Sequence, residues 1–157
     1  MINPRWVAST LIALAAAFAT IAAHAADMQT AAPDRVHEAN GITFVSGGIG
    51  AESRESLASR EKSYNFKLVL SLEGSGAYVS DALVTLASAD GRKRVEHVAE
   101  GPLFLAGLPA GTYVVTATFR NQTYTRRVQV RADRLHTEYM RWPANPQLDV
   151  TTPWEAK

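Results

Sequence analysis

The sequence predicts an all-β fold in which antiparallel strands form two packed layers. The first observation is that short segments with alternating apolar and polar residues recur through residues 42–142, which is typical of strands that bury one face. The second is that glycine or proline turn signals separate these segments roughly every 8 to 12 residues. The third is that only residues 51–63 have the composition of a helix. We therefore expect an antiparallel β-sandwich of about seven strands with one short N-terminal helix.

The clearest strand signal is a β-hairpin within residues 108–131. A turn at 109–111 combines proline, which presets φ, with glycine, which tolerates positive φ. Asn121 and Gln122 then reverse the chain. One face of the first strand carries Tyr113, Val115, Ala117 and Phe119, and one face of the second carries Tyr124, Val128 and Val130. This alternation predicts a strand pair with one buried and one solvated face.

The remaining elements are predicted from similar local patterns. In the expected helix, acidic residues near the start and basic residues near the end complement the helix dipole, and Leu57 is the main apolar anchor. The dipeptide Asp90-Gly91 is a hairpin signal between two strands. The other expected strands cover residues 42–45, 66–72, 82–87, 93–100, 103–108 and 135–142.

The two ends of the chain are expected to lie outside this β-domain of residues 42–142. Residues 1–25 combine a positive residue, a long apolar run and the small-residue pattern Ala23-His24-Ala25, which predicts a cleaved signal peptide and export to a bacterial periplasm. The alternative is a membrane anchor, because the apolar run approaches spanning length. After processing we expect no integral membrane span. Residues 26–41 are expected to be a flexible linker with a solvated His37, and residues 143–157 an irregular tail.

Composition argues against several classes of function. The formal net charge is +1, which argues against a general nucleic-acid-binding protein. The chain has no cysteine, which excludes disulfides, thiolate metal sites, cysteine nucleophiles and lipid attachment at a cysteine. With these classes set aside, the partner that we expect for a non-enzymatic module is a protein or an envelope polymer.

No catalytic residue, cofactor or metal ligand is predicted, and we expect the protein not to be an enzyme. After the expected leader the histidines are His37, His97 and His136, and the last two lie on different predicted strands. A zinc site made from these two and a neighbouring glutamate would lack the short spacing of known zinc motifs. We therefore expect surface histidines. The glycines at 46–50 lack the lysine of a phosphate-binding loop, so we interpret them as a turn.

The candidate binding residues are four arginines of the hairpin and two tryptophans. They are Arg120, Arg126, Arg127, Arg131, Trp142 and Trp154. The arginines either bind an anionic partner or form a solvated strand face that discourages edge aggregation, and the solvated face is the simpler interpretation. Arg126 shares the parity of Val128, so we expect it at the edge of the core, paired with a carboxylate such as Asp81 or Glu100. Trp154 either pins the tail to the body or is an exposed contact.

Several motifs in series resemble a known family. Residues 80–86 read Ser-Asp-Ala-Leu-Val-Thr-Leu, an Asp-Gly follows, residues 108–117 read Leu-Pro-Ala-Gly-Thr-Tyr-Val-Val-Thr-Ala, and residues 126–130 read Arg-Arg-Val-Gln-Val. This series resembles the carboxypeptidase regulatory-like domains over roughly residues 44–142, and residues 45–66 look like a subgroup of small secreted Gram-negative proteins that carry this domain. The resemblance implies a transthyretin-like, or prealbumin-like, β-sandwich and a non-catalytic role.

The expected function is therefore that of a non-catalytic periplasmic accessory or binding module. It would engage a protein or an envelope component, for instance by strand addition at an open sheet edge. An alternative is a carbohydrate-binding module, which needs exposed aromatic side chains along one face, and the candidates are Tyr78, Tyr124, Tyr139, Trp142 and Trp154. A small hydrolase like the transthyretin-related purine-pathway enzymes is less expected, because the chain lacks the Tyr-Arg-Gly-Ser type of C-terminal signature of that group.

Overall fold

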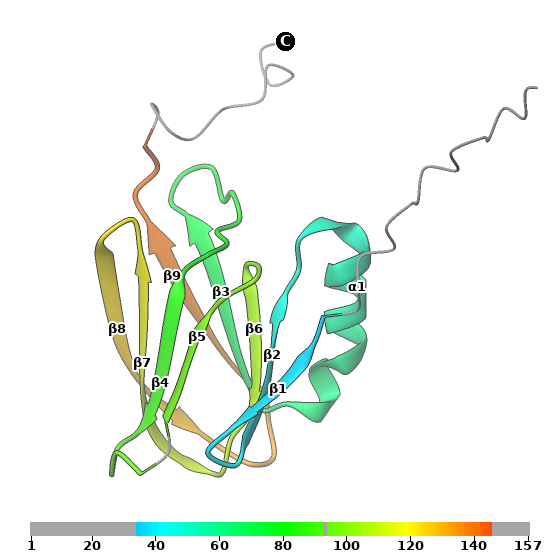
Figure 1. Ribbon diagram of the computed structural model, residues 1–157, viewed down its shortest axis with the longest axis vertical. Coiled ribbons are helices and arrows are strands. Elements are labelled where there is room, and N and C mark those ends of the chain that lie inside the picture. Colours follow the sequence, from blue (N-terminus) through cyan, green and yellow to red (C-terminus); the bar gives the residue numbers. More distant parts are fainter. Residues whose placement is uncertain (1–33, 93, 146–157) are drawn as a thin grey trace, which may run out of the picture.

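The structure, a computed structural model of the chain, describes residues 34–92 and 94–145. Within these residues it has nine strands, one α-helix and a short 3-10 turn, and Figure 1 shows the strands in two layers with the helix on the outer side of one layer. The elements are β1 (Val36–Ala39), β2 (Ile42–Gly47), α1 (Gly50–Arg60), η1 (Glu61–Ser63), β3 (Phe66–Leu72), β4 (Leu83–Ser88), β5 (Arg94–Val98), β6 (Leu103–Gly107), β7 (Gly111–Phe119), β8 (Gln122–Val130) and β9 (His136–Trp142).

The strands form two sheets that face each other. One sheet has five strands in the order β1-β2-β6-β3-β9, and the other has four in the order β5-β4-β7-β8. Side chains from both sheets form one continuous core, whose largest fully buried members include Trp142, Phe66 and Phe104. The predicted all-β sandwich is therefore confirmed, with nine strands in the described ranges where about seven were expected.

The predicted hairpin is formed by β7 and β8. These strands pair antiparallel from Gly111 opposite Val130 to Phe119 opposite Gln122. The side chains expected inside are buried in most cases: Tyr113, Val115, Ala117, Val128 and Val130. The turn consists of Arg120 (φ 48°) and Asn121 (φ 63°), and two positive φ angles are what a type I′ hairpin turn requires. The reversal therefore lies one residue earlier than predicted.

Strand β1 lies within residues 26–41, where the sequence predicted a flexible linker, so that prediction is wrong for residues 36–39. β1 pairs antiparallel with β2, and His37 lies opposite Phe44. The connecting residues Asn40 (φ 52°) and Gly41 (φ 71°) again form a two-residue turn with positive φ. A strand of four residues, two of them polar, is too short to give a periodic signal.

Strand β9 corrects the expectation of a wholly antiparallel sandwich. It pairs in parallel with β3 over all seven residues, from Phe66 opposite His136 to Leu72 opposite Trp142. The alternation in residues 135–142 predicted the strand but contained no information on its partner. As the outermost strand of the five-stranded sheet, β9 lies on the same flank of the sandwich as β8.

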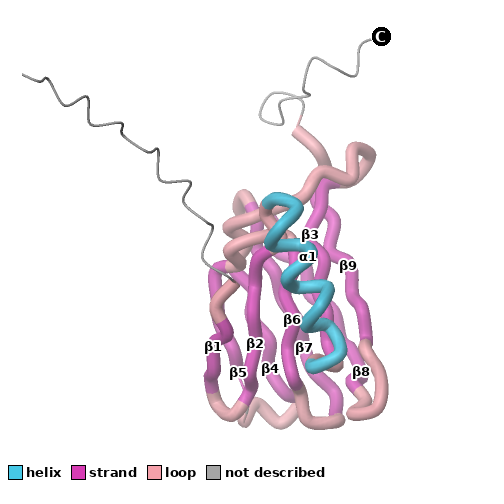
Figure 2. The backbone as a smooth tube through the Cα atoms, turned by 90° about the vertical axis from the view of Figure 1, so that its right-hand side faces the viewer, coloured by secondary structure: helices cyan, strands magenta, loops and turns pink. Residues whose placement is uncertain are grey.

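The helix covers the outer face of the five-stranded sheet, as Figure 2 shows from that side. Leu57 is buried against Val45 and Leu105 in a small second core, so its predicted role as the apolar anchor is confirmed. At the start of the helix, the hydroxyl of Ser53 accepts a hydrogen bond from the backbone N–H of Gly48 at 2.6 Å and donates one to Asp34 Oδ1 at 2.6 Å. The glycine segment before α1 is thus a turn between β2 and the helix, as interpreted.

Candidate functional site

The four predicted arginines lie along one strand and do not converge on one point. We call Arg120, Arg126, Arg127 and Arg131 the arginine row. Arg120 is in the turn before β8, Arg126 and Arg127 are on β8, and Arg131 follows it directly. Since an antiparallel strand rises about 3.4 Å per residue, the two ends of β8 lie roughly 27 Å apart. The row therefore offers charge to an extended anion and cannot enclose a compact one.

Within the row, neighbouring side chains point in different directions. Arg120 lies over the ring of Phe119, with 4.8 Å from its guanidinium carbon to the ring centroid. Arg127 is opposite Val114 of β7 and has the parity that faces away from the core. It is exposed and forms no ion pair with the described part of the chain. Arg127 is thus a cation that remains available on the outer face of the four-stranded sheet.

Arg126 has a different carboxylate partner from those expected. It lies at the edge of the core, as its parity predicted, but its Nε is 3.6 Å from Glu138 Oε1 on β9. Asp81 and Glu100 were the expected partners, and both are wrong. The reason is topological, because β8 and β9 form one flank of the sandwich and Glu100 follows β5 on the other. The Arg126–Glu138 pair links the edges of the two sheets.

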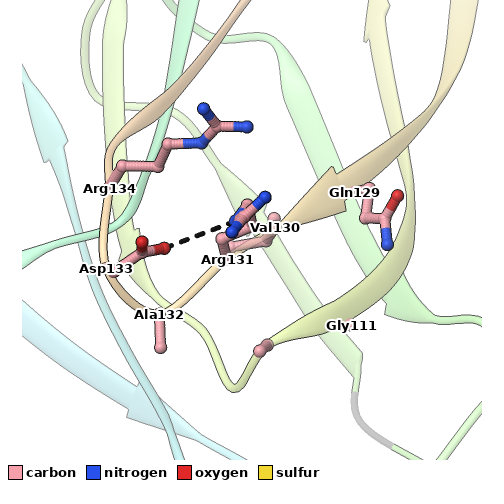
Figure 3. Close-up of a pocket in the computed structure, with 8 residues that line it drawn as sticks. Gly111, Gln129, Val130, Arg131, Ala132, Asp133 and Arg134 are labelled. Atoms are coloured by element: carbon pink, nitrogen blue, oxygen red, sulfur yellow. Dashed lines mark ion pairs between the residues drawn. The ribbon is translucent and has the colours of Figure 1, made fainter.

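A shallow, open pocket lies where β8 ends. Figure 3 shows Arg131 joined to Asp133, at 3.5 Å from Nε to Oδ1, with the side chain of Arg134 along the same opening. Arg134 forms no ion pair with any residue that the structure describes. The pocket is lined by Ala110, Gly111, Gln129, Val130, Arg131, Ala132, Asp133 and Arg134. It extends the positive charge of the arginine row beyond the end of the strand.

The aromatic candidates do not form a binding row. Trp142 is only 1% exposed and belongs to the core, so its assignment as a surface residue is wrong. Its position in β9 directs its side chain towards the core. Its Nε1–H donates a hydrogen bond to the carbonyl of Gln122 at 3.0 Å. Tyr124 packs partly against the core, whereas Tyr78 and Tyr139 are exposed. Trp154 lies outside the described residues.

A second cluster of polar side chains lies on the opposite flank, where the edge strands β1 and β5 meet. His37 comes from β1, Ser46 from β2, His97 from β5 and Glu100 from the loop after β5. One potential ligand atom from each of His37, His97 and Glu100 lies within 4.8 Å of the others. The two imidazole rings are 4.8 Å apart between centroids. From the sequence these histidines were expected to be separate surface residues.

Ser46 and His97 are as close as a catalytic nucleophile and its base, but Ser46 is not accessible to a substrate. Ser46 Oγ lies 2.9 Å from His97 Nε2 and accepts a hydrogen bond from the backbone N–H of Glu100 at 3.1 Å. Ser46 is fully buried. Burial, and then the neighbouring His37, hold the pKa of His97 below its ordinary value of 6.5. A nucleophile must reach its substrate, so this arrangement orients the imidazole and gives no support to acyl transfer.

His136 does not join His97. It lies at the start of β9, stacked on Phe66 with 6.2 Å between ring centroids, and its Nε2 is 3.6 Å from Glu138 Oε2. The zinc site considered from the sequence, with His97 and His136 together, is therefore not formed. The histidine that approaches His97 is His37.

No protein-family model matches the chain, and no curated protein matches it in sequence.

The histidine cluster had a partial signal in the sequence. His97 was expected at the surface, but it shares the parity of Val95, which is buried, and this parity places its side chain on the inner face of the strand. Ser46 likewise shares the parity of Ile42 and Phe44 on β2. What the pattern lacks is the strand order, which alone brings the inner faces of β1, β2 and β5 together.

Across the described ranges, no helix has the length and apolar character needed to cross a membrane.

Proposed function

We propose that this protein is a non-catalytic accessory module of the bacterial periplasm that binds an extended acidic segment of a partner protein along β8. The observation that carries the proposal is the arginine row on an edge strand. β8 is nine residues long, and β7 is its only strand partner among the described residues. An edge strand of this length can accept a further strand through its backbone groups.

The hairpin geometry indicates which backbone groups of β8 are available. In a two-residue hairpin the pair that closes the turn, Phe119 with Gln122, is hydrogen-bonded, and hydrogen-bonded pairs alternate from there. The N–H and C=O groups of the intervening residues therefore point away from β7. These residues are Thr123, Thr125, Arg127 and Gln129. A peptide strand could pair with them while its acidic side chains meet the arginines.

Charge selects the class of partner. Residues 120–141 contain six arginines and two acidic residues, and the acidic residues are Asp133 and Glu138, each already near one arginine. Arg127 and Arg134 are therefore left to attract negative charge from outside. An extended acidic peptide matches both the linear spacing of the row and its open backbone edge.

The proposal also includes the periplasmic location and a transthyretin-like fold of the β-sandwich. Residues 1–25 have the composition of a cleaved signal peptide and lie outside the described residues, so export to the periplasm rests on the sequence alone. The two facing sheets are consistent with a transthyretin-like domain of the carboxypeptidase regulatory-like kind, whose resemblance motifs fall on β4, β7 and β8. The carbohydrate-binding alternative has less support, because Trp142 is buried and Tyr124 is half-buried.

The test is binding of a synthetic ten-residue peptide of alternating glutamate and threonine, measured by fluorescence anisotropy at low and physiological salt. We expect the double substitution Arg127→Glu and Arg131→Glu to weaken binding about tenfold, the equivalent of about 1.4 kcal/mol. Added salt should weaken it further. N-methylation of alternate peptide residues should also weaken binding, because strand addition needs backbone donors and acceptors.

The matched control is Arg94→Glu, which reverses an exposed arginine on β5, the opposite edge of the same sheet. Its effect on the dissociation constant should stay within twofold. If Arg94→Glu weakens binding as much as the β8 substitutions, the attraction is a general charge effect and the site is wrong. If N-methylation has no effect, strand addition is excluded and only charge remains.

A further inference from the structure

The cluster of His37, His97 and Glu100 holds three groups that commonly bind metal ions. They come from β1, β5 and the loop after β5, and one ligand atom of each lies within 4.8 Å of the other two. His37 Nε2 is 3.9 Å from Glu100 Oε1. The cluster joins the edge strands of the two sheets, because β1 belongs to one sheet and β5 to the other.

His37 has a polar atom without a hydrogen-bond partner. Its Nε2 is buried and makes no hydrogen bond within the described structure. The ring is held by stacking on Phe44 at 5.3 Å between centroids, with an interplanar angle of 17°. Buried polar atoms are nearly always paired, and an unpaired one calls for an explanation such as an ion. This nitrogen lies 3.9 Å from Glu100 Oε1, and the pair is the first indication of a cation-binding site.

His97 is oriented by a second layer of contacts. A hydrogen bond of 2.9 Å between Ser46 Oγ and the ring nitrogen Nε2 orients the imidazole of His97. Ser46 Oγ is held in turn by a hydrogen bond from the backbone N–H of Glu100. Metal-binding histidines generally have such a partner, which sets the orientation of the ring. Burial and the neighbouring His37 lower the pKa of His97, which favours the neutral imidazole, the form that binds metal ions.

We propose that His37, His97 and Glu100 bind one divalent metal ion of the zinc type. Two imidazole nitrogens and one carboxylate oxygen form a ligand set that suits zinc and its neighbours better than magnesium or calcium. The side chain of Glu100 is 53% exposed, so it can rotate to bring its carboxylate closer to the two imidazoles, towards the roughly 3.4 Å between ligand atoms of a tetrahedral zinc site. Water would complete the coordination from the open side.

The expected role of this ion is to fasten one flank of the sandwich. It would connect β1 to β5 across the gap between the sheets, a flank where Asn40 Nδ2 already donates a hydrogen bond to the carbonyl of Arg94 at 2.7 Å. An ion that binds only the folded chain stabilises it in proportion to the logarithm of its concentration over the dissociation constant. This inference does not depend on the proposed role of β8, which lies on the other flank.

The test uses Zn²⁺ alone with the untagged full chain, in a background where His24 is replaced by Gln. Isothermal titration calorimetry should give one equivalent of bound zinc, and zinc should raise the thermal unfolding midpoint. The substitutions His37→Gln, His97→Gln and Glu100→Gln should each weaken binding at least tenfold and remove the rise in the midpoint. Circular dichroism of each variant without zinc checks that the fold is retained.

The matched control is His136→Gln. His136 also has a buried Nε2 without a hydrogen-bond partner and a glutamate nearby, but no second histidine among the described residues forms a ligand cluster with it. Binding and thermal shift should therefore match those of the background protein. The absence of zinc binding, or an equal loss in His136→Gln, would overturn the proposal. If His97→Gln fails to fold, Glu100→Gln decides the matter, because Glu100 is exposed and its substitution leaves the core intact.

Discussion

The indole N–H of Trp142 donates a hydrogen bond to the backbone carbonyl of Gln122 at 3.0 Å, and so joins the last strand of one sheet to the first residue of β8 in the other. The indole ring also meets Phe119 and Tyr124 edge-on, at 5.7 and 5.5 Å between centroids. Each sheet has its edge strand on this flank, so this contact closes the sandwich there.

Replacing Trp142 with phenylalanine should therefore destabilise the fold. The substitution removes the hydrogen bond and leaves a space where the larger ring was, so the free energy of unfolding in urea should fall by about 2–3 kcal/mol. The control is Tyr139→Phe, at an exposed position of the same strand, where the change should stay below about 0.5 kcal/mol. Equal effects at the two positions would show that Trp142 does not close this flank.

Asn65 joins three segments through its side-chain amide. Its Nδ2 donates to the carbonyls of Leu108 at 2.8 Å and Arg131 at 3.0 Å, and its Oδ1 accepts from the N–H of Leu108 at 2.8 Å. Asn65→Asp keeps the acceptor but turns a carboxylate towards two carbonyl groups. We expect a loss of about 2–3 kcal/mol in the free energy of unfolding. Asn121→Asp, in the exposed turn before β8, should be nearly neutral; a similar loss there would refute the role of the amide.

Gly101 lies against the backbone of Gly47. A Cβ atom at Gly101 would be 2.2 Å from the carbonyl oxygen of Gly47, far inside contact distance, and both residues are buried. Gly101→Ala should therefore cost about 2–3 kcal/mol of stability through backbone displacement. At Gly111 an added Cβ meets nothing closer than 3.8 Å, so thermal unfolding of Gly111→Ala should stay close to that of the parent. Retention of full stability in Gly101→Ala would contradict the packing at this point.

Asp90 has a carboxylate stabilised by three local hydrogen bonds. The hydroxyl of Ser88 at 2.5 Å, the backbone N–H of Arg92 and the side chain of Arg92 together lower its pKa from 3.8 to about 2. Because the pKa is lowered in the folded state, the stabilisation is present above about pH 4 and is lost as the pH falls towards 2. Ser88→Ala should raise the pKa of Asp90 towards 3.8, as measured by carboxyl ¹³C NMR titration. An unchanged pKa in that variant would exclude the hydroxyl as its main cause.

The fold was predictable where one face of a strand is buried against the other sheet. In β7 and β8 the alternation of buried and exposed residues follows directly from the pleat, so the sequence alone predicts which side chains enter the core. Trp142 also follows this parity, and it was placed outside only because tryptophan was considered as a ligand-binding residue. Pairing is different: the parallel partner of β9 depends on where the whole chain crosses between sheets, which no local pattern contains.

In the candidate sites, too, features within one strand were predictable from the sequence, and contacts between distant strands were not. The arginine row was predictable because all four residues belong to one hairpin, and their order along β8 fixes their spacing. The partner of Arg126 was not, because Glu138 reaches it only through the docking of β9. The contact between His37 and His97 required both the unexpected strand β1 and the strand order at the other flank. Residues that meet across two sheet edges have no constant sequence spacing.

The parallel pairing of β3 with β9 also sets the order in which the chain can fold. Phe66 of β3 pairs with His136 of β9, which lies 70 positions later in the sequence. Contacts between residues so distant in sequence slow folding. During synthesis the hairpin of β7 and β8 can form before β9 emerges, whereas the inner surface that Trp142 covers stays uncovered until this last described strand has been made. In that interval the nascent chain exposes apolar surface, the condition in which chains aggregate or bind chaperones.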